Sequence, residues 1–317
     1  MPKPNAIVVC CTQNWLPLAA ATLLSCAEQG AGDPTDLYAI VFEAAPADRE
    51  RLARFATGRG VKIEVIDGIL PPALQAMWDA RVVNPGILLR MALDHYLPHE
   101  PERVLYLDCD ILALRPLGEV FATELNGNAL GAVEDWQSMS GPLRSFQDHP
   151  RAIGLPHGAR YFNAGVLLLD WQKTLQQDLL GKSVALWSER IAHGTPLPMM
   201  DQDALNLGFQ NNWQPLPVSL NAAAVMCDYF REPTALRHFS SAQKPWGKGW
   251  MPGLAPYKER YRALLASDWP EFPIPDFSET KIADVAGVLL RRVDFITAAR
   301  YRAHVKAGLA PQKPRGQ

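Results

Sequence analysis

The chain has 317 residues, of which 48% are hydrophobic and 20% are charged, and its formal net charge is −2. These values are ordinary for a globular protein with one large domain or two small ones. The near-neutral charge argues against a nucleic-acid partner, and no apolar run reaches the roughly 18 residues of a membrane-spanning helix.

Short apolar runs alternate with helical patterns over the first hundred residues. Strands are predicted at 6–11, 36–43, 61–67 and 104–108, the last of them buried on both faces. Three helices are predicted between these strands. They are 14–30, with Asn14 as its N-cap and Pro17 in its first turn; 46–60, closed by Gly58 or Gly60; and 84–97. The alternation predicts an α/β fold with a mostly parallel central sheet and helices on both faces.

Later in the chain, strands are predicted at 129–135 and 162–170, followed by a long helix at 171–192 and an irregular proline-rich stretch. From residue 278 the sequence again has helical periodicity, before a tail that is predicted to be disordered. The predicted helix carries Arg291, Arg292, Arg300, Arg302 and Lys306. This last helix is either a solvated amphipathic helix packed on the domain or a basic face that lies on an anionic membrane surface.

Two carboxylates, Asp108 and Asp110, follow the buried strand at 104–108. Ligands of parallel α/β sheets bind beyond the carboxyl ends of the strands, and two buried carboxylates need neutralisation. Three interpretations are open: a Mg²⁺ or Mn²⁺ site, the aspartyl nucleophile of a haloacid-dehalogenase-like phosphatase, or an incidental turn. Leu112 counts against the phosphatase, whose motif has Thr or Val at that place.

Three later stretches carry polar groups suited to the same site. YFNAGVLLLD (161–170) places Asn163 beside an Ala-Gly pair, where backbone and amide can approach a ligand closely. DQDALN (201–206) begins a helix with two carboxylates around an amide, and ordinary capping explains Asp203. HFSSAQKPW (238–246) contains His238, a candidate metal ligand, and Lys244, a candidate phosphate partner.

In this order, VLYLDCD, YFNAGVLLL, DQDALN and HFSSAQKPW resemble the motifs of glycosyltransferase family 8, over residues 5–250. These are retaining, metal-dependent nucleotide-sugar transferases with a GT-A fold, a Rossmann-like mostly parallel sheet. Within the family the chain is similar to bacterial galactosyl- and glucosyltransferases of lipopolysaccharide assembly. The resemblance implies a catalytic domain at 1–255 and a helical C-terminal extension at 256–317.

The resemblance also implies a role for each matched residue. Asp108, Asp110 and His238 would hold Mn²⁺, with Mg²⁺ as the alternative, and Lys244 would contact the diphosphate of a UDP-sugar. The other matches are Arg90 near the donor sugar and phosphates, Asn163, Asp201 and Gln202 in the sugar pocket, Asp135 toward the acceptor, and Thr12 and Asn14 at the base. Trp15 would either stack on the base or belong to the core.

We therefore expect Mn²⁺-dependent transfer of a hexose from a UDP-sugar to a glycan, glycolipid or lipopolysaccharide-type acceptor. Double displacement would need a carboxylate nucleophile, whereas the family offers mainly the amide of Gln202, so same-face attack is predicted, with Asp201 orienting the donor. The alternatives are a catalytically weak nucleotide-sugar-binding protein and a metal-dependent phosphatase. Five cysteines without CxxC spacing indicate a cytoplasmic protein, with peripheral contact at the inner face of the membrane as an open alternative.

Overall fold

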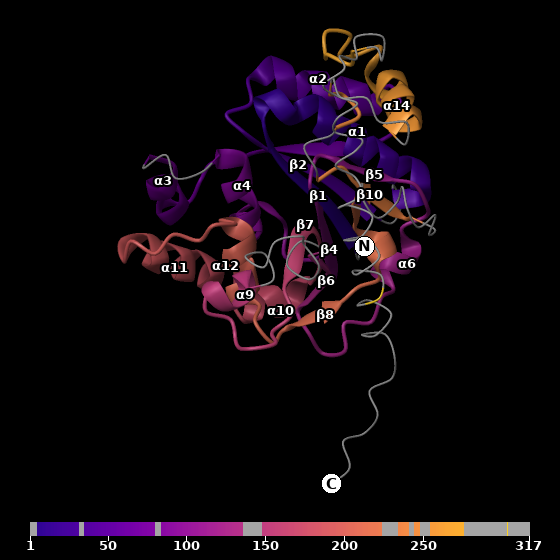
Figure 1. Ribbon diagram of the computed structural model, residues 1–317. Helices are drawn as coiled ribbons and strands as arrows, with labels where there is room; N and C mark the ends of the chain where they lie inside the picture. Colours follow the sequence, from indigo (N-terminus) through magenta and orange to yellow (C-terminus); the bar gives the residue numbers. More distant parts are fainter. Residues whose placement is uncertain are drawn as a thin grey trace, which may run out of the picture.

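The structure is a computed structural model that describes residues 5–31, 35–79, 84–135, 148–223, 234–240, 244–247 and 254–275, together with Ala303. Its centre is a seven-stranded sheet in the order β3-β2-β1-β4-β7-β6-β8 (Figure 1). The strands are β1 (Asn5–Thr12), β2 (Thr35–Phe42), β3 (Ile63–Asp67), β4 (Arg103–Leu107), β6 (Leu130–Glu134), β7 (Phe162–Asp170) and β8 (Trp213–Pro215).

The predicted mostly parallel sheet is confirmed, with one reversed strand. Strands β1 to β4 pair in parallel, and β6 pairs in parallel with β8. In contrast, β7 runs antiparallel to both β4 and β6. Because β7 is reversed, its first residues lie at the same edge of the sheet as the last residues of β1 and β4.

Helices cover both faces of the sheet, as predicted, because successive strand side chains point to opposite faces. Ile7 and Val9 belong to the hydrophobic cluster on one face, whereas Ala6 and Val8 belong to the cluster on the other. The first face carries α1 (Leu16–Cys26), α2 (Pro46–Thr57) and α14 (Ala255–Leu265), which gather on one side of the molecule in Figure 1. The second carries α3 (Pro72–Asp79), α4 (Pro85–Leu89), α5 (Leu93–Tyr96), α10 (Trp171–Gln176), α11 (Leu179–Ala192) and α12 (Asp201–Gly208).

The helix predicted at 14–30 is shorter than expected at both ends. A 3-10 turn, η1 (Gln13–Trp15), precedes α1, so Asn14 is not its N-cap; that position belongs to Trp15, without a side-chain cap. Pro17 does lie in the first turn. The helix ends at Cys26 and passes into a π turn, η2 (Ala27–Ala31), in which Gly30 has a φ of 85°. Glycine takes this left-handed conformation without steric cost.

Two other predicted helices are interrupted. The helix predicted at 84–97 consists of α4, the 3-10 turn η3 (Arg90–Ala92) and α5. The helix predicted at 171–192 breaks between α10 and α11, where Asp178 has a φ of 49°, a conformation that Asp tolerates better than most residues. The apolar pattern continues across both breaks, and periodicity therefore does not reveal them.

A second, three-stranded sheet was not predicted from the sequence. It has the order β5-β10-β9, with β5 (Ile111–Ala113), β9 (Ala222–Ala223) and β10 (Leu236–His238). Strands of two or three residues are too short to show alternation. In this sheet β10 pairs antiparallel with β5 and sets His238 opposite Ile111, next to Asp110. The remaining short elements are α6 (Gly118–Phe121), α9 (His149–Ala152) and η4 (Val218–Leu220).

The part of the predicted C-terminal extension that the structure describes packs on the sheet. Tyr261 and Leu264 of α14 are buried in the same cluster as α1. The helix predicted from residue 278 and the predicted tail lie outside the described residues, apart from Ala303, so the division at residue 255 stays a prediction. No helix in the described ranges is long and apolar enough to cross a membrane.

Candidate active site

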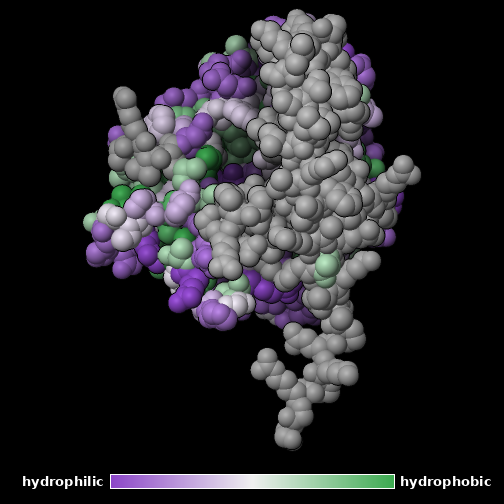
Figure 2. Space-filling view, in the orientation of Figure 1, coloured by the Kyte–Doolittle hydropathy of each residue, from purple (hydrophilic) through white to green (hydrophobic). Residues whose placement is uncertain are grey.

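The candidate site lies at the edge of the main sheet where β1 and β4 end and β7 begins. Asp108 follows β4 directly, and its backbone N–H donates to the carbonyl oxygen of Gly165 at 2.9 Å. Asn163 and Ala164 therefore lie beside Asp108, although they are distant in sequence. Figure 2 shows a hollow in the described surface between the helices at the top and those at the lower left.

Asp108, Asp110 and His238 form the only cluster among the described residues that could hold a metal ion. One ligand atom from each lies within 4.8 Å of the others. His238 Nε2 is 3.1 Å from Asp110 Oδ1 and 3.7 Å from Asp108 Oδ2. Two carboxylates and an imidazole suit Mn²⁺, and the carboxylates alone would suit Mg²⁺. The donor set therefore fits a divalent metal ion, as the sequence predicted.

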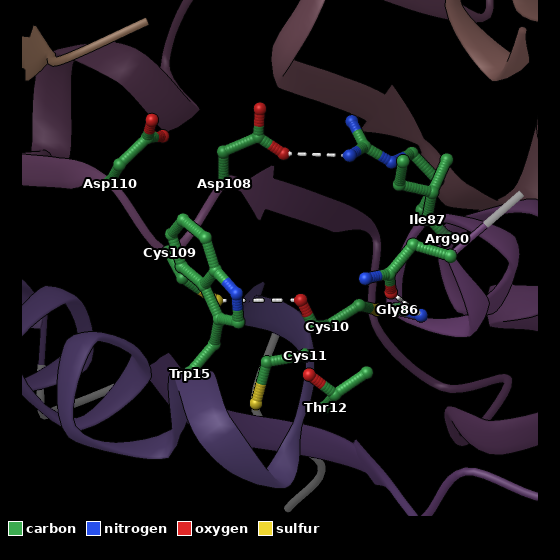
Figure 3. A pocket seen from close by; sticks show the side chains of 11 residues that line it. Cys10, Cys11, Thr12, Trp15, Gly86, Ile87, Arg90, Asp108, Cys109 and Asp110 are labelled. Atoms are coloured by element: carbon green, nitrogen blue, oxygen red, sulfur yellow. Dashed lines mark hydrogen bonds and ion pairs between the residues drawn. The ribbon is translucent and has the colours of Figure 1, made fainter. Parts of the chain in front are cut away.

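Cys109, between the two aspartates, faces the other way. In Figure 3 the carboxylates point to one side of the chain and Cys109 lies on the opposite side. Its thiol lies 3.4 Å from the carbonyl oxygen of Cys10, and it is buried. A hydrogen bond with Cys11 and burial both raise the pKa of Cys109, which makes the thiol an inert part of the core.

A cation flanks each aspartate. Lys244 Nζ lies 2.6 Å from Asp110 Oδ2 and also donates to the carbonyl oxygen of Phe239. Arg90 Nη2 lies 3.0 Å from Asp108 Oδ1, which also accepts from the hydroxyl of Tyr106 at 2.8 Å. Burial by itself would raise the pKa of Asp110, but His238 and Lys244 outweigh it and lower that pKa below its usual range.

Arg90 also connects the metal cluster to α12. Its Nη1 donates to the carbonyl oxygen of Ala164 at 3.1 Å, and its Nε lies 3.0 Å from Asp201 Oδ2 without the alignment of a hydrogen bond. Burial raises the pKa of Asp201 to about 6, against the lowering effect of Arg90. The 3-10 turn η3 begins at Arg90 itself.

A group of amides lies on the other side of Asp201. Gln202 Oε1 accepts from the N–H of Ala164 at 3.0 Å and from Asn163 Nδ2 at 3.2 Å, and Asn163 Nδ2 also lies 3.2 Å from Asp135 Oδ2. The structure thus brings together the predicted sugar-pocket residues Asn163, Asp201 and Gln202, with Asp135 beside them.

A cavity of about 220 Å³ opens beside the metal cluster (Figure 3). Thr12, Trp15, Arg90, Asp108 and Asp110 are among the residues that line it, whereas Asn14 is exposed in η1 and is not one of them. Trp15 is 39% exposed, and this excludes the core role that the sequence left open.

Four site residues were missed by sequence reasoning or assigned another role. The hydroxyl of Tyr106 donates to Asp108, and Asn221 Oδ1 lies 2.7 Å from Nδ1 of His238.

Asp203, assigned to capping, is fully buried and accepts from the hydroxyl of Tyr161 at 2.5 Å and from the N–H of Met199 at 2.8 Å. Tyr161 in turn accepts from Gln202 Nε2 at 3.2 Å. The DQDALN motif places Asp203 near the site, but a single Asn221 in an irregular stretch gives no signal.

Comparison with solved structures identifies the class of fold. The structure is similar to the crystal structure of the galactosyltransferase LgtC in complex with donor and acceptor sugar analogues, with a TM-score of 0.70 and 22% identity. The match covers 84% of this chain and 99% of LgtC. The fold is therefore of the GT-A type, as the sequence predicted.

Comparison of sequences identifies the family. The model of glycosyl transferase family 8 matches residues 6–249, and the chain belongs to this family. It is 30% identical over 183 residues to a probable glycosyl transferase Gly of Streptococcus gordonii, covering 56% of this chain and 24% of that protein. It is 25% identical over 236 residues to a lipopolysaccharide 1,2-glucosyltransferase of Escherichia coli K12, covering 70% and 66%. The chain thus spans about a quarter of the first relative and about two thirds of the second.

Proposed function

We propose that the protein is a retaining glycosyltransferase that moves a hexose from a UDP-sugar to a glycan or lipopolysaccharide-type acceptor. The observation that carries this proposal is the convergence of Asp108, Asp110 and His238 at the ligand-binding edge of the sheet, between the cations of Arg90 and Lys244. Membership of family 8 and the names of the relatives support the same reaction class.

The donor's diphosphate is proposed to lie at the metal cluster, held by Mn²⁺ on Asp108, Asp110 and His238. When bound, the ion neutralises the negative charge of a diphosphate leaving group. Lys244 places its ammonium group at Asp110, where it stabilises the same charge. The cavity lined by Thr12 and the exposed ring of Trp15 is proposed to take the base, with uracil hydrogen-bonded to Thr12 and stacked on Trp15.

Same-face displacement accounts best for retention in this site. The bond between the anomeric carbon and the β-phosphate oxygen breaks, the acceptor oxygen bonds to the same face, and its proton passes to the departing phosphate. The oxygen of Gln202 already accepts two hydrogen bonds, which makes the amide a still poorer nucleophile. Asp201 is paired with Arg90 and orients the donor, while Asp135 faces the acceptor.

A trapped intermediate would contradict this mechanism. We expect mass spectrometry of the protein with a slowly reacting donor to show no sugar attached to Asp201 or Gln202. The product linkage, read by NMR, should keep the anomeric configuration of the donor. A covalent adduct on either residue would require double displacement instead.

The donor can be identified by thermal denaturation, since a ligand that binds the native state stabilises it by about 2.7 kcal/mol at a hundredfold excess over its Kd. UDP-glucose, UDP-galactose, UDP-N-acetylglucosamine and UDP should each be tested with and without Mn²⁺, and the shift should require the metal. Asp110→Asn should abolish the shift, whereas Asp148→Asn, at an exposed position, should keep it. A wild type that responds to no UDP compound would exclude the donor class.

The place of action is proposed to be the cytoplasm, at the inner face of the membrane. The basic face of the predicted helix from 278 supports this proposal, because basic amphipathic helices bind anionic lipid surfaces. Sedimentation with vesicles of anionic lipid, but not with neutral vesicles, should remove the full chain from solution. Equal recovery with both would contradict membrane contact.

A further inference from the structure

We propose that a relay of two side-chain amides fixes the orientation of the His238 ring, with Nδ1 as the hydrogen-bond donor and Asn221 as the positioning residue. The relay runs from Asp135 through Asn163 and Asn221 to Nδ1 of His238, and so joins the proposed sugar pocket to the metal cluster. Its importance for catalysis rests on the metal site proposed above, but its hydrogen bonds do not.

Two neighbouring groups fix the orientation of the first amide of the relay, that of Asn163. The backbone N–H of Gly165, which can only donate, lies 3.0 Å from Asn163 Oδ1. The carboxylate of Asp135, which can only accept when ionised, lies 3.2 Å from Asn163 Nδ2. Both contacts require the same orientation of the Asn163 amide.

The second amide passes this orientation on to the imidazole. Asn221 Nδ2 donates to Asn163 Oδ1 at 2.8 Å, and this turns Asn221 Oδ1 toward Nδ1 of His238 at 2.7 Å. An amide oxygen only accepts, so Nδ1 must carry a proton. Asn221 is 6% exposed and His238 is 3% exposed, and water therefore has little access to replace either partner.

The protonated Nδ1 has a consequence for the metal. With Nδ1 engaged by Asn221, Nε2 is the ring nitrogen left to bind a metal, and it faces Asp110 at 3.1 Å. The ring is also held from behind, because a Cβ on Gly165 would lie 2.3 Å from His238 Cε1. Partners that orient a metal-bound histidine typically change metal affinity 10- to 100-fold when they are removed.

The relay therefore makes metal affinity depend on residues that do not bind the metal. Asp135 and Asn163 should influence Mn²⁺ binding even when no sugar is present. Because coupling between two ligands is reciprocal, a donor sugar that engages Asn163 should change the affinity for Mn²⁺, and Mn²⁺ should change the affinity for the sugar.

The first test is NMR of metal-free wild-type protein labelled with ¹⁵N-histidine. His238 is assigned by the loss of its signals in His238→Gln, and long-range ¹H–¹⁵N correlations then report which ring nitrogen carries a proton. We expect Nδ1, and not Nε2, to carry the proton of the neutral ring in the wild type. An unprotonated Nδ1 would overturn the relay, and this result does not depend on metal binding or on the folding of a variant that lacks Asn221.

The second test measures Mn²⁺ affinity without donor, by electron paramagnetic resonance of free Mn²⁺. Asn221→Leu should weaken binding about 10-fold or more, and Asp135→Asn should weaken it in the same direction. The matched control is Glu134→Gln, which removes an equal charge from the neighbouring carboxylate, one paired with Arg160 instead.

The outcomes of the second test separate the two proposals. Unchanged Mn²⁺ affinity in Asn221→Leu, or an equal loss in Glu134→Gln and Asp135→Asn, would overturn the relay. Failure of the wild type to bind Mn²⁺ would exclude the proposed metal site, and the NMR measurement would then decide the relay alone.

Discussion

At the scale of single residues, the metal cluster depends on a glycine, Gly165, which has no side chain to occupy the space of the His238 ring. Gly165 lies behind the ring of His238, and a Cβ built there would lie 2.3 Å from Cε1 and 2.8 Å from Nδ1. The imidazole is itself held between Asn221 and Asp110 and cannot yield without leaving the carboxylates. A glycine is therefore required at position 165 to leave room for the imidazole of His238. From the sequence alone, the Ala-Gly pair indicated only that a ligand could approach the backbone closely.

Gly165→Ala should therefore displace His238 and abolish Mn²⁺ binding, with a loss of stability of about 1 to 3 kcal/mol from overpacking. Thermal denaturation with and without Mn²⁺ measures both effects. Gly118→Ala is the matched control, because a Cβ there meets no atom within 4 Å. A Gly165→Ala protein whose denaturation temperature still rises with Mn²⁺ would contradict this account of the ring's position.

The raised pKa of Asp201 predicts a specific dependence of stability on pH. The folded-state pKa is about 6, above the value of about 3.9 in unfolded chains, so the native state binds the proton more tightly. This contribution to stability is complete below pH 4 and is lost as the pH rises through 6, for a total of about 3 kcal/mol.

Asp201→Asn removes that titration. The free energy of unfolding of the wild type, measured in urea, should fall relative to that of Asp201→Asn between pH 4 and pH 7. A difference between the two proteins that stays constant over this range would show that Asp201 keeps an ordinary pKa.

At the scale of elements, the strands of five or more residues in the main sheet were predictable from the sequence, whereas the strands of two or three residues in the second sheet were not. The strands β1, β2, β3, β4, β6 and β7 all lie where the apolar runs predicted them, to within two residues. The strands β5, β9 and β10 have two or three residues, too few for a period. Yet β10 carries His238, so the contact between His238 and Asp110 was accessible only through resemblance to a family.

The start of α12 depends on a buried carboxylate that the sequence assigned to capping. Asp203 accepts from the N–H of Met199 and from the hydroxyl of Tyr161, and His149 Nε2 lies 2.6 Å away. Met200, which directly precedes α12, has φ 50° and ψ −118°, an unfavourable conformation for a residue with a side chain. Asp203 therefore holds a strained turn just before Asp201 and Gln202.

Asp203→Asn should destabilise the protein by about 2 to 4 kcal/mol, because the amide turns a donor toward groups that need an acceptor. The midpoint of urea unfolding measures the loss. Asp148→Asn, an exposed change next to His149, should stay within about 0.5 kcal/mol of the wild type. Equal midpoints for the two variants would mean that Asp203 does not hold the turn.

At the scale of the whole molecule, the chain after residue 255 contacts α2 and the turn that follows it, through ion pairs as well as apolar packing. Arg59 Nη1 lies 3.1 Å from Asp268 Oδ2, and Arg51 Nη1 lies 2.7 Å from Glu271 Oε1. Trp269 is buried against Phe55, with ring centroids 5.0 Å apart. Trp269 thus belongs to the hydrophobic cluster on the same face of the sheet as α1 and α2, and the ion pairs lie beside it.

Two truncations test where the folded unit ends. A chain that stops at residue 275 should unfold cooperatively near the wild-type temperature. A chain that stops at residue 254 should lose the burial of Tyr261, Leu264 and Trp269, at about 1.5 to 3 kcal/mol for each large side chain, and should aggregate or unfold. Similar stability of both chains would favour a separable extension from residue 256.

The pairing of β10 with β5 ties the metal cluster to the order of folding. Asp110 and Lys244 are 134 residues apart in sequence, and contacts between such distant residues form slowly because a long loop must close first. No fragment that lacks β10 can assemble the three ligands. Mn²⁺ binding during refolding should therefore appear no earlier than the pairing of β10 with β5, and the bound ion reports a completed second sheet.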